Sequence, residues 1–442
     1  MWNNMKKLIV SVLFLVMCVC IYANELSERE PDWWKDAGLG IFFHIGPYSC
    51  YKGEYKGRPS SGTAEWIQSQ FWIRNSEYEE VAKTFNPVKF DADQWVRRAK
   101  DAGAQYIVFT SKHHDGFANF RTDFSDYSLW NYQHKDMVRD LARACEKYNM
   151  RFGIYYSHNV DWHEKDGGAN DPQLHKKIGW CPSNQWDFPP GEDKDYDVNR
   201  YFESKAFPQI KELLTNYGKV DIMWFDLAYG ITEKQAKKFY DLVKGIQPDC
   251  LICSRICFEN FKYADYHSLA DNTTAKEPTE NRSEACITLN DTWGYSRLDN
   301  NWKSSEWILH TLAKSVALNS NICLNVGPKP DGSWPEETVQ VFRELSDWMK
   351  INKESIHGNR PVFGVPVNDD YVFTRKGKTV YLHFLKDMAS VDIYEFKTKA
   401  KSIKVLGNRY KIKWLQKRDD YIIHIDCQGK TDLSVLKIVF ND

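Results

Sequence analysis

Short apolar runs alternate with amphipathic segments along the chain from Gly38 to about Asn352. The apolar runs have four to six residues, as buried strands of a parallel sheet do, and helical patterns separate them. The predicted strands are Gly40–His44, Tyr106–Thr110, Phe152–Tyr156, Val220–Phe225, Leu251–Ser254, Cys286–Leu289 and Ile322–Val326. Seven or eight such units over roughly 310 residues predict an α/β fold of the (β/α)8-like TIM-barrel type. An open doubly wound sheet fits less well, because no Gly-x-Gly-x-x-Gly motif follows the first strand.

The segments between the apolar runs carry helical signals. Asp91, with Gln94 three residues later, has the pattern of a helix N-cap, and Gly103 marks the end of that helix. Two further helices each place apolar residues on one face, around Leu141 and around Leu213. The order of strand, loop and helix therefore repeats along this part of the chain.

After Pro361 the pattern changes to a simple alternation of apolar and polar residues. The predicted strands are Tyr371–Thr374, Thr379–Leu385, Val391–Phe396, Ile403–Leu406, Tyr421–Ile425 and Leu433–Phe440. Gly or charged turns between them predict an antiparallel β-sandwich of about 80 residues. We therefore expect a signal peptide over residues 1–23, a catalytic barrel over 24–358 and a C-terminal β-sandwich over 359–442.

The N-terminus has the pattern of a secretory signal peptide. Two lysines precede an apolar run, Leu8–Ile21, interrupted only by Ser11, and polar sequence follows from Asn24. This run is shorter than the ~20 apolar residues that span a membrane, and no later segment approaches that length. We expect a secreted or periplasmic protein without a membrane span. A lipoprotein is less favoured, because neither Cys18 nor Cys20 follows the small residues of a lipobox.

Composition and charge narrow the class of ligand. The 59 Lys and Arg residues nearly cancel the 60 Asp and Glu residues, so there is no basic field that would bind nucleic acid. Aromatic residues make up 15% of the chain. This share is compatible with a neutral ring-shaped ligand, but composition alone favours rings that fill a large core. Cysteines lack close repeating spacings, and we expect buried thiols rather than a disulfide framework or a zinc site.

Polar and charged residues gather at the predicted strand ends, where catalytic side chains of a TIM barrel lie. These residues are His44, Lys112, His113, His114, Asp115, Tyr155, Tyr156, His158, Asp226 and Arg255, with Glu284 just before the sixth strand. Carboxyl groups, imidazoles and aromatic rings on one face suit a sugar site. The rings would stack on the apolar face of the sugar, and the polar groups would bind its hydroxyls.

Asp226 is the strongest candidate for a catalytic carboxyl group, because it directly follows the predicted buried run Val220–Phe225. The alternative is a loop or helix-capping carboxylate bound to backbone donors. Hydrolysis of a glycoside with retention needs a second carboxyl group roughly 5–5.5 Å away. Glu284 is one possibility, and the other glutamates that compete for this position are Glu65, Glu259, Glu277 and Glu280.

A metal site is a second interpretation of the histidines. The residues that could form a zinc or other divalent site are His44, His113, His114, His158, Asp161 and His163. No His-x-His pair follows the first strand, so we expect no metal and no cofactor. The segment Asn325–Pro328, with Gly327 before Pro328, predicts a structural turn.

At these residues the chain resembles the α-L-fucosidases of glycoside hydrolase family 29. The matching segments are His44–Ser49, Ala64–Trp66, Ala102–Tyr106, Ser111–Phe117, Gly153–Ser157, Asp221–Asp226, Thr292–Tyr295, Asn325–Pro328 and Glu354–Pro361. They follow the family's order and span most of the chain after the predicted signal peptide.

The resemblance implies a retaining exo-hydrolase that removes terminal α-L-fucose from fucosylated glycans. Asp226 matches the family nucleophile, and Glu284 resembles the acid/base of one branch of the family. The positions matching those that hold the fucose hydroxyls and support the nucleophile are His44, His113, His114, Tyr156, Trp224 and Arg255. The resemblance also implies that Trp66 and Trp293 form walls of the sugar site and that Glu65 accepts a hydroxyl.

Two positions depart from the family pattern. Ser283 stands where relatives often have Trp, which bears on Glu284, and Leu227 follows the nucleophile where relatives often have Gly. Three alternatives stay open at this point: a catalytically silent fucose-binding protein, a metal-dependent barrel hydrolase, and an α-L-glycosidase for a related sugar such as an L-galactoside. The fucosyl linkage and the oligomeric state also stay open.

Overall fold

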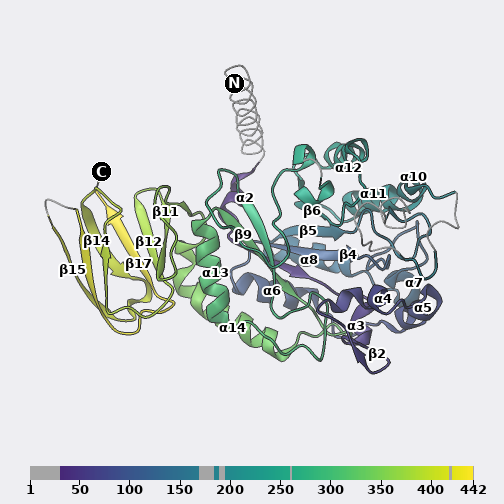
Figure 1. Ribbon diagram of the computed structural model, residues 1–442, viewed down its shortest axis with the longest axis horizontal. Coiled ribbons are helices and arrows are strands. Elements are labelled where there is room, and N and C mark those ends of the chain that lie inside the picture. Colours follow the sequence, from purple (N-terminus) through teal and green to yellow (C-terminus); the bar gives the residue numbers. More distant parts are fainter. Residues whose placement is uncertain (1–29, 169–183, 189–194, 259–260, 418–420, 442) are drawn as a thin grey trace, which may run out of the picture.

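The computed structural model describes residues 30–168, 184–188, 195–258, 261–417 and 421–441. Figure 1 shows two parts of the molecule: a parallel sheet surrounded by helices at the right, and antiparallel sheets at the left. Helices α13 (Ser305–Ala317) and α14 (Glu336–Asn352) lie between the two parts. The predicted signal peptide, residues 1–23, lies outside the described residues. Among the residues that are described, no helix has the length and apolar character needed to cross a membrane.

A seven-stranded parallel sheet forms the larger part, in the order β7-β6-β5-β4-β1-β9-β8. Its strands are β1 (Leu39–Phe43), β4 (Tyr106–Lys112), β5 (Arg151–Tyr156), β6 (Ile222–Phe225), β7 (Leu251–Ile252), β8 (Ser283–Thr288) and β9 (Ser320–Val326). Nearly every residue in these strands is buried, because helices cover the outer face of the sheet and its inner face packs in the barrel interior. Each strand overlaps a predicted one, and the predicted α/β barrel class is confirmed.

A polar segment, residues 265–269, closes this sheet between its edge strands β7 and β8. Tyr266 forms a parallel bridge with Cys253, and Ser268 forms one with Glu284. The Glu284 amide donates to the His267 carbonyl at 2.8 Å. Because both edges are paired in this way, the sheet closes into a barrel even though the eighth position is not a regular strand.

Helices surround the barrel, and short elements form its connections. The helices are α2 (Asp32–Ala37), α3 (Tyr48–Tyr51), α4 (Ile67–Gln70), α5 (Asn75–Thr84), α6 (Ala92–Asp101), α7 (Leu129–Gln133), α8 (Met137–Tyr148), α10 (Val198–Tyr201), α11 (Phe207–Asn216) and α12 (Glu233–Ile246). The short elements are β2 (Glu54–Tyr55), β3 (Arg58–Pro59), η1 (Ala64–Trp66), η3 (Phe202–Ala206), η4 (Ser254–Ile256), η5 (Phe261–Tyr263) and η6 (Lys353–Ser355). As predicted, Asp91 caps α6, accepting a hydrogen bond from the Gln94 amide at 2.9 Å.

Two antiparallel sheets follow the barrel and enclose their own apolar core. The first contains β10 (Arg360–Pro361), β11 (Tyr371–Lys376), β12 (Thr379–Phe384), β17 (Val435–Phe440) and β14 (Ala400–Val405), in that order, with η7 (Leu406–Asn408) after β14. The second contains β13 (Ser390–Ile393), β16 (Ile423–Gln428) and β15 (Lys411–Gln416). All six predicted strands are present. β15 is absent from the prediction, because it is an edge strand with mostly exposed residues.

Helix α13 joins the barrel to these sheets. A small apolar cluster at the contact contains Ala313, Ala317, Val372 and Leu385. Nearby, the indole N–H of Trp348 donates to the Leu433 carbonyl at 2.7 Å. The contact is therefore packed and hydrogen-bonded rather than a bare linker.

A substitution at Gly40 would test how tightly the barrel interior is packed. A Cβ at this position would meet the ring of Tyr106 at 2.2 Å, and Tyr106 is fully buried with its hydroxyl bonded to Glu284 at 2.7 Å. We expect Gly40→Ala to destabilise the protein by about 1–3 kcal/mol through overpacking, measured as a lower midpoint of urea unfolding. Gly245→Ala in α12 is the control, because a Cβ there meets nothing within 4 Å and Ala should stabilise the helix by about 0.5–1 kcal/mol. A Gly40→Ala variant as stable as the wild type would contradict this packing.

Candidate active site

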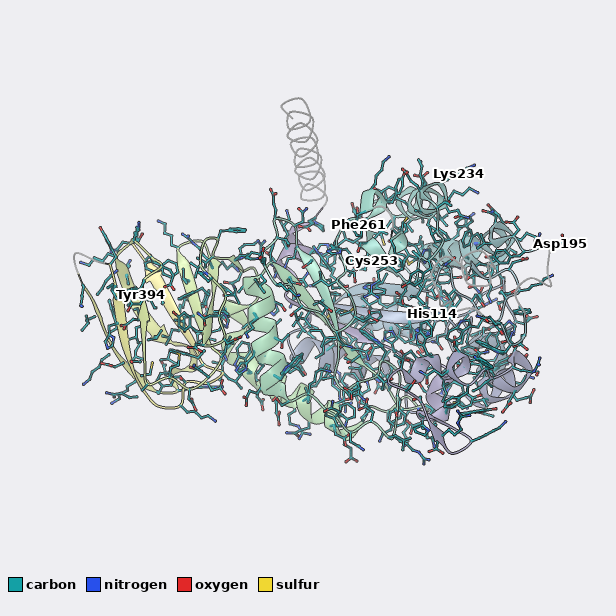
Figure 2. All side chains as sticks on the ribbon, viewed as in Figure 1. His114, Asp195, Lys234, Cys253, Phe261 and Tyr394 are labelled. Carbon is teal, nitrogen blue, oxygen red and sulfur yellow. The ribbon has the colours of Figure 1, made fainter. Side chains whose placement is uncertain are left out.

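A cavity of about 510 Å³ lies at the C-terminal ends of the barrel strands, where TIM-barrel chemistry is found. It brings together Asp226 and eight of the nine predicted sugar-binding residues. These eight are His44, Glu65, Trp66, His113, His114, Trp224, Arg255 and Trp293. His114 is labelled in Figure 2, inside the barrel part of the molecule. Two predicted site residues, Tyr156 and Glu284, do not line this cavity.

Asp226 follows β6 and is held from three directions. The Tyr155 hydroxyl donates to its Oδ2 at 3.0 Å, and Arg255 Nη1 donates to its Oδ1 at 3.2 Å. Nε2 of His114 lies 3.6 Å from Oδ2. Burial raises the pKa of Asp226, Arg255 and the Tyr155 hydrogen bond oppose that rise, and nearby Asp271 adds to it. A carboxylate supported in this way can act as a nucleophile.

Arg255 connects Asp226 to a second carboxyl group, that of Asp271. Its Nη2 donates to Asp271 Oδ1 at 2.5 Å and to the Leu269 carbonyl at 2.8 Å. Because Nη1 and Nη2 are bonded to one carbon, the two carboxyl groups lie on neighbouring sides of a single guanidinium. The Asp271 side chain is 52% exposed, whereas that of Asp226 is 14% exposed. The cavity therefore holds one buried and one accessible carboxyl group, and glycoside hydrolysis uses a pair of carboxyl groups.

Asp271 is not among the residues predicted from the sequence. It follows the closing segment 265–269, which is polar and does not resemble a strand. Asn272 anchors it to the rim: the Asn272 amide donates to the Cys286 carbonyl at 3.0 Å, and its side-chain oxygen accepts from the Thr288 amide at 2.9 Å. An Asp-Asn pair between two predicted strands is the sequence signal that could have pointed to this position.

The prediction for Tyr156 is corrected to Tyr155. Successive residues of a strand point to opposite faces, so of these two neighbours on β5 only one can face the barrel interior. Tyr155 lines the cavity and bonds Asp226. Tyr156 points outward to α11, where its hydroxyl donates to Gln209 at 2.8 Å.

The prediction for Glu284 does not fit its position. Glu284 is the second residue of β8, and four residues at ~3.3 Å each place it about 13 Å below the strand's C-terminal end. It is fully buried, and it accepts hydrogen bonds from Trp224 Nε1 and the Tyr106 hydroxyl, both at 2.7 Å. Burial raises its pKa. Glu284 therefore supports the floor of the cavity and does not face the ligand space.

Three buried histidines make the cavity polar without charging it. Burial lowers the pKa of His44 to about 3, and it lowers the pKa values of His113 and His114 well below the usual range. The side-chain amide of Asn325 donates to the Trp293 carbonyl at 2.8 Å, which turns its oxygen to His44 Nδ1, 2.6 Å away. His44 therefore carries its proton on Nδ1 and keeps Nε2 as an acceptor. The Asn325–Pro328 turn thus orients a site residue.

Glu65 is a buried carboxyl group on another wall of the cavity. Its Oε2 accepts from the Gly294 amide at 2.9 Å and from the Thr292 hydroxyl at 3.2 Å. Burial raises its pKa to about 7. Glu65 Oε1 and His113 Nδ1 are buried without a hydrogen-bond partner among the described residues. Because buried polar atoms are normally paired, these two atoms are suited to sugar hydroxyls.

Leu227 marks the departure from the family pattern next to Asp226. Its φ of +49° lies in the left-handed region, which is strained for a residue with a Cβ. Asn159 donates to its carbonyl at 3.1 Å, and its side chain packs with Trp66 and Trp162. An apolar side chain thus fills a wall where Gly would leave space.

Asp161 and the Nε2 atom of His158, both considered for a metal site, have other partners. Asp161 accepts from Lys112 at 3.1 Å and from Lys205 at 3.0 Å, all three being buried. Two ammonium groups on one carboxylate oppose the binding of a cation there. His158 Nε2 is 3.2 Å from the Ile256 carbonyl, so this nitrogen is bonded to the backbone.

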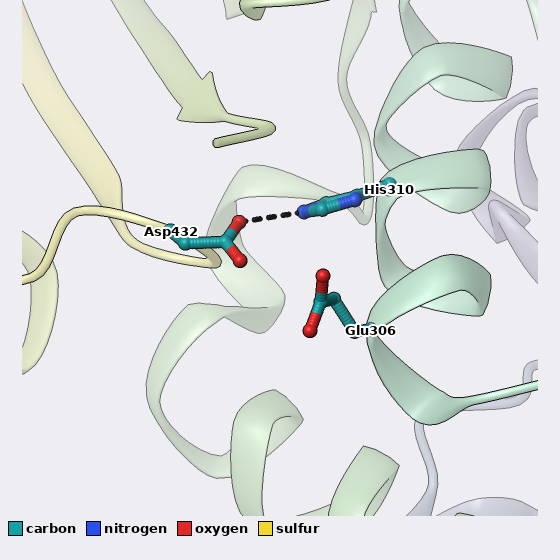
Figure 3. Close-up of side chains that lie close together, drawn as sticks. All are labelled: Glu306, His310 and Asp432. Atoms are coloured by element: carbon teal, nitrogen blue, oxygen red, sulfur yellow. Dashed lines mark hydrogen bonds and ion pairs between the residues drawn. The ribbon is translucent and has the colours of Figure 1, made fainter. Parts of the chain in front are cut away.

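Within the part of the chain that the structure describes, one group of three side chains has metal-ligating atoms within reach of one another. It consists of Glu306, His310 and Asp432. Figure 3 shows them between α13 and the connection from β16 to β17, where His310 Nε2 lies 2.8 Å from Asp432 Oδ1. None of the three lines the cavity, so they have no part in its chemistry.

Comparisons with known proteins identify the family. The α-L-fucosidase family model matches residues 22–354. The crystal structure of α-L-fucosidase from Vibrio sp. strain EJY3 has a TM-score of 0.85 and 28% identity, covering 93% of this chain and 72% of that chain. α-L-Fucosidase AlfC from Lactobacillus casei, solved with α-L-fucose, has a TM-score of 0.67 and 37% identity, covering 72% of this chain and 98% of that chain.

Similarity extends to animal proteins. Tissue α-L-fucosidase of Mus musculus is 26% identical over 88% of this chain and 86% of that protein. The family match spans most of the chain, the fold agrees with it, and the cavity holds a carboxyl pair at the barrel rim. The chain belongs to the α-L-fucosidase family, glycoside hydrolase family 29.

Proposed function

We propose that this cavity hydrolyses terminal α-L-fucosides of glycans with retention, using Asp226 as nucleophile and Asp271 as acid/base. The observation that carries the proposal is the pair of carboxyl groups on one guanidinium, with Arg255 bonded to Asp226 at 3.2 Å and to Asp271 at 2.5 Å. Retention needs carboxyl groups ~5–5.5 Å apart, which neighbouring nitrogens of one Arg side chain can hold. Family membership supports fucose as the sugar.

The reaction would proceed by two displacements. Asp226 attacks the anomeric carbon while Asp271 gives a proton to the glycosidic oxygen, so the aglycone leaves as an alcohol and a fucosyl ester forms on Asp226. Asp271, now a carboxylate, takes a proton from water, and the resulting nucleophile cleaves the ester. Neutral His44 and His113 can bind the fucose hydroxyls without repelling the positive charge that develops on the sugar ring.

Exposure favours Asp271 over the other carboxyl groups as acid/base. The aglycone carries the rest of the glycan and must leave toward solvent, so its proton donor must be at the mouth of the cavity. Asp271 is half exposed, and its side chain can turn from Arg255 to a bound glycosidic oxygen. Glu65 is 1% exposed, and Glu284 is under the cavity floor.

Asp226→Asn tests the nucleophile. The carboxamide has nearly the same shape but cannot form the ester, so we expect kcat on an aryl α-L-fucoside to fall by at least about a thousandfold. Fucose should still bind, because the imidazoles and tryptophans of the cavity are unchanged, and calorimetry with fucose would show it. Turnover above about a tenth of the wild-type value would contradict the assignment.

Asp271→Ala tests the acid/base. We expect kcat/KM to fall about 10²–10⁴-fold on fucosyl disaccharides and much less on fucosides of acidic phenols, whose departure needs little protonation. Azide should restore part of the activity, because it can attack the ester without a general base. The controls are Glu284→Gln and Glu65→Gln, for which we expect losses that do not depend on the leaving group. A leaving-group dependence in a control variant but not in Asp271→Ala would move the role to that glutamate.

Tyr155→Phe tests the support of the nucleophile through the pH profile. The Tyr155 hydrogen bond favours the ionised carboxylate and so lowers the pKa of Asp226. Without it the pKa rises, and the acid limb of kcat/KM should move to higher pH, because the nucleophile must be ionised. Loss of a hydrogen bond to a charged group should also lower kcat/KM about ten- to a hundredfold. Tyr156→Phe, which loses a bond to Gln209 instead, should keep the wild-type acid limb, and an unshifted limb in Tyr155→Phe would refute this role.

A further inference from the structure

The mouth of the catalytic cavity carries exposed aromatic rings. Phe258 and Phe261, the latter labelled in Figure 2, are 40% and 49% exposed. Of the exposed large apolar side chains in the described residues, these two line the cavity. Single exposed apolar residues need no explanation, but a group of them beside a binding site marks a surface for a ligand.

Neighbouring rings hold these side chains in place. Phe258 packs edge-to-face on Tyr229, with ring centroids 5.0 Å apart and an interplanar angle of 69°. Phe261 makes a similar contact with His267, at 5.2 Å and 63°. Both partners also line the cavity. Such contacts limit the motion of exposed rings, so less conformational entropy is lost when a ligand packs on them.

The position of the rings in the chain ties them to the leaving group. Phe258 and Phe261 belong to the connection between β7 and β8, which also carries Arg255 and Asp271. The proposed acid Asp271 must touch the glycosidic oxygen, and the aglycone therefore has to lie against this connection. The wall that contains Glu65 comes from a different part of the chain, η1 after β1, and its buried polar atoms suit fucose.

Size and charge indicate what the rings bind. About 510 Å³ falls in the ~300–1,000 Å³ range of pockets for drug-sized ligands, which are larger than a single sugar. Two cations lie on this connection: Arg255 is paired with Asp226 and Asp271, and Lys262 is paired with Glu233 at 3.5 Å. Burial, followed by the charge of Arg255, lowers the pKa of His267, which keeps that imidazole neutral. The mouth therefore suits a neutral aglycone with an apolar face.

We infer that Phe258, Phe261 and Tyr229 form an aglycone subsite that binds the neutral pyranose linked to fucose by packing against its C–H face. This inference rests on the proposed function, because it takes Asp271 as the acid at the leaving group. The subsite would hold the aglycone ring in the orientation that brings the glycosidic oxygen to Asp271.

The test compares substrates with and without an aglycone ring. α-L-Fucosyl fluoride releases fluoride, which cannot contact the rings, and the second substrate is the best-cleaved member of a set of fucosyl hexose and N-acetylhexosamine disaccharides. In the double variant Phe258→Ala/Phe261→Ala, we expect the ratio of kcat/KM for the disaccharide to that for the fluoride to fall at least tenfold, or about 1.4 kcal/mol. The ring-preserving variant Phe258→Tyr/Phe261→Tyr should keep the ratio within about threefold of the wild-type ratio.

The matched control is Phe124→Ala, because Phe124 is 45% exposed and lies outside the cavity. It should leave the ratio unchanged. Binding provides a second measurement that does not need turnover: in an Asp226→Asn background, the ring-deleting substitutions should weaken disaccharide binding about tenfold while fucose binding changes less.

Three contrary results are possible in these experiments, and each would overturn a different claim. An unchanged ratio in the double alanine variant would overturn the subsite. An equal loss on octyl α-L-fucoside would mean that the rings bind any apolar aglycone, and would overturn the assignment to a pyranose. If the wild type cleaves neither the fluoride nor any disaccharide, the proposed function itself is wrong.

Discussion

The active site at the rim of the barrel depends on closure of the barrel between β7 and β8. A sheet with open edges exposes unpaired N–H and C=O groups, and residues 265–269 pair through their backbone with one residue at each edge, Cys253 and Glu284. The same connection carries Arg255 before the closing segment and Asp271 after it. Closure therefore brings the guanidinium and the second carboxyl group to Asp226, so a backbone requirement also assembles the catalytic pair.

Support for this pair reaches down to the barrel floor. The buried carboxyl group of Glu284 accepts from Trp224 and Tyr106, which fixes the Trp224 ring at the base of the cavity. The guanidinium of Arg255 lies over that ring at 4.7 Å and bonds Asp226. A buried acid that resembles a catalytic residue in the sequence thus has a positioning role, because it accepts the indole N–H of Trp224, which lines the cavity.

Hydrophobic pattern predicted the parts of the site that follow apolar runs, such as Asp226 after β6. It could not separate Tyr155 from Tyr156, because both faces of a parallel strand are buried and neither neighbour is marked as inward. It misplaced Glu284, because a strand predicted to begin at Cys286 leaves this residue in a loop, whereas β8 begins at Ser283. The pattern did not predict Asp271 as a site residue, because the segment that positions it pairs through its backbone and has no continuous run of apolar residues.

Burial explains how one pocket can hold many ionisable groups and still receive a neutral sugar. It lowers the pKa values of the bases His44, His113 and His114 and raises those of the acids, so that both kinds of group tend to the neutral form. For Asp226, burial has the largest effect and raises the pKa, while Arg255 and the Tyr155 hydroxyl oppose that rise and favour the carboxylate. Asp226 must be ionised to attack the anomeric carbon, and the uncharged imidazoles around it avoid repelling the cationic transition state.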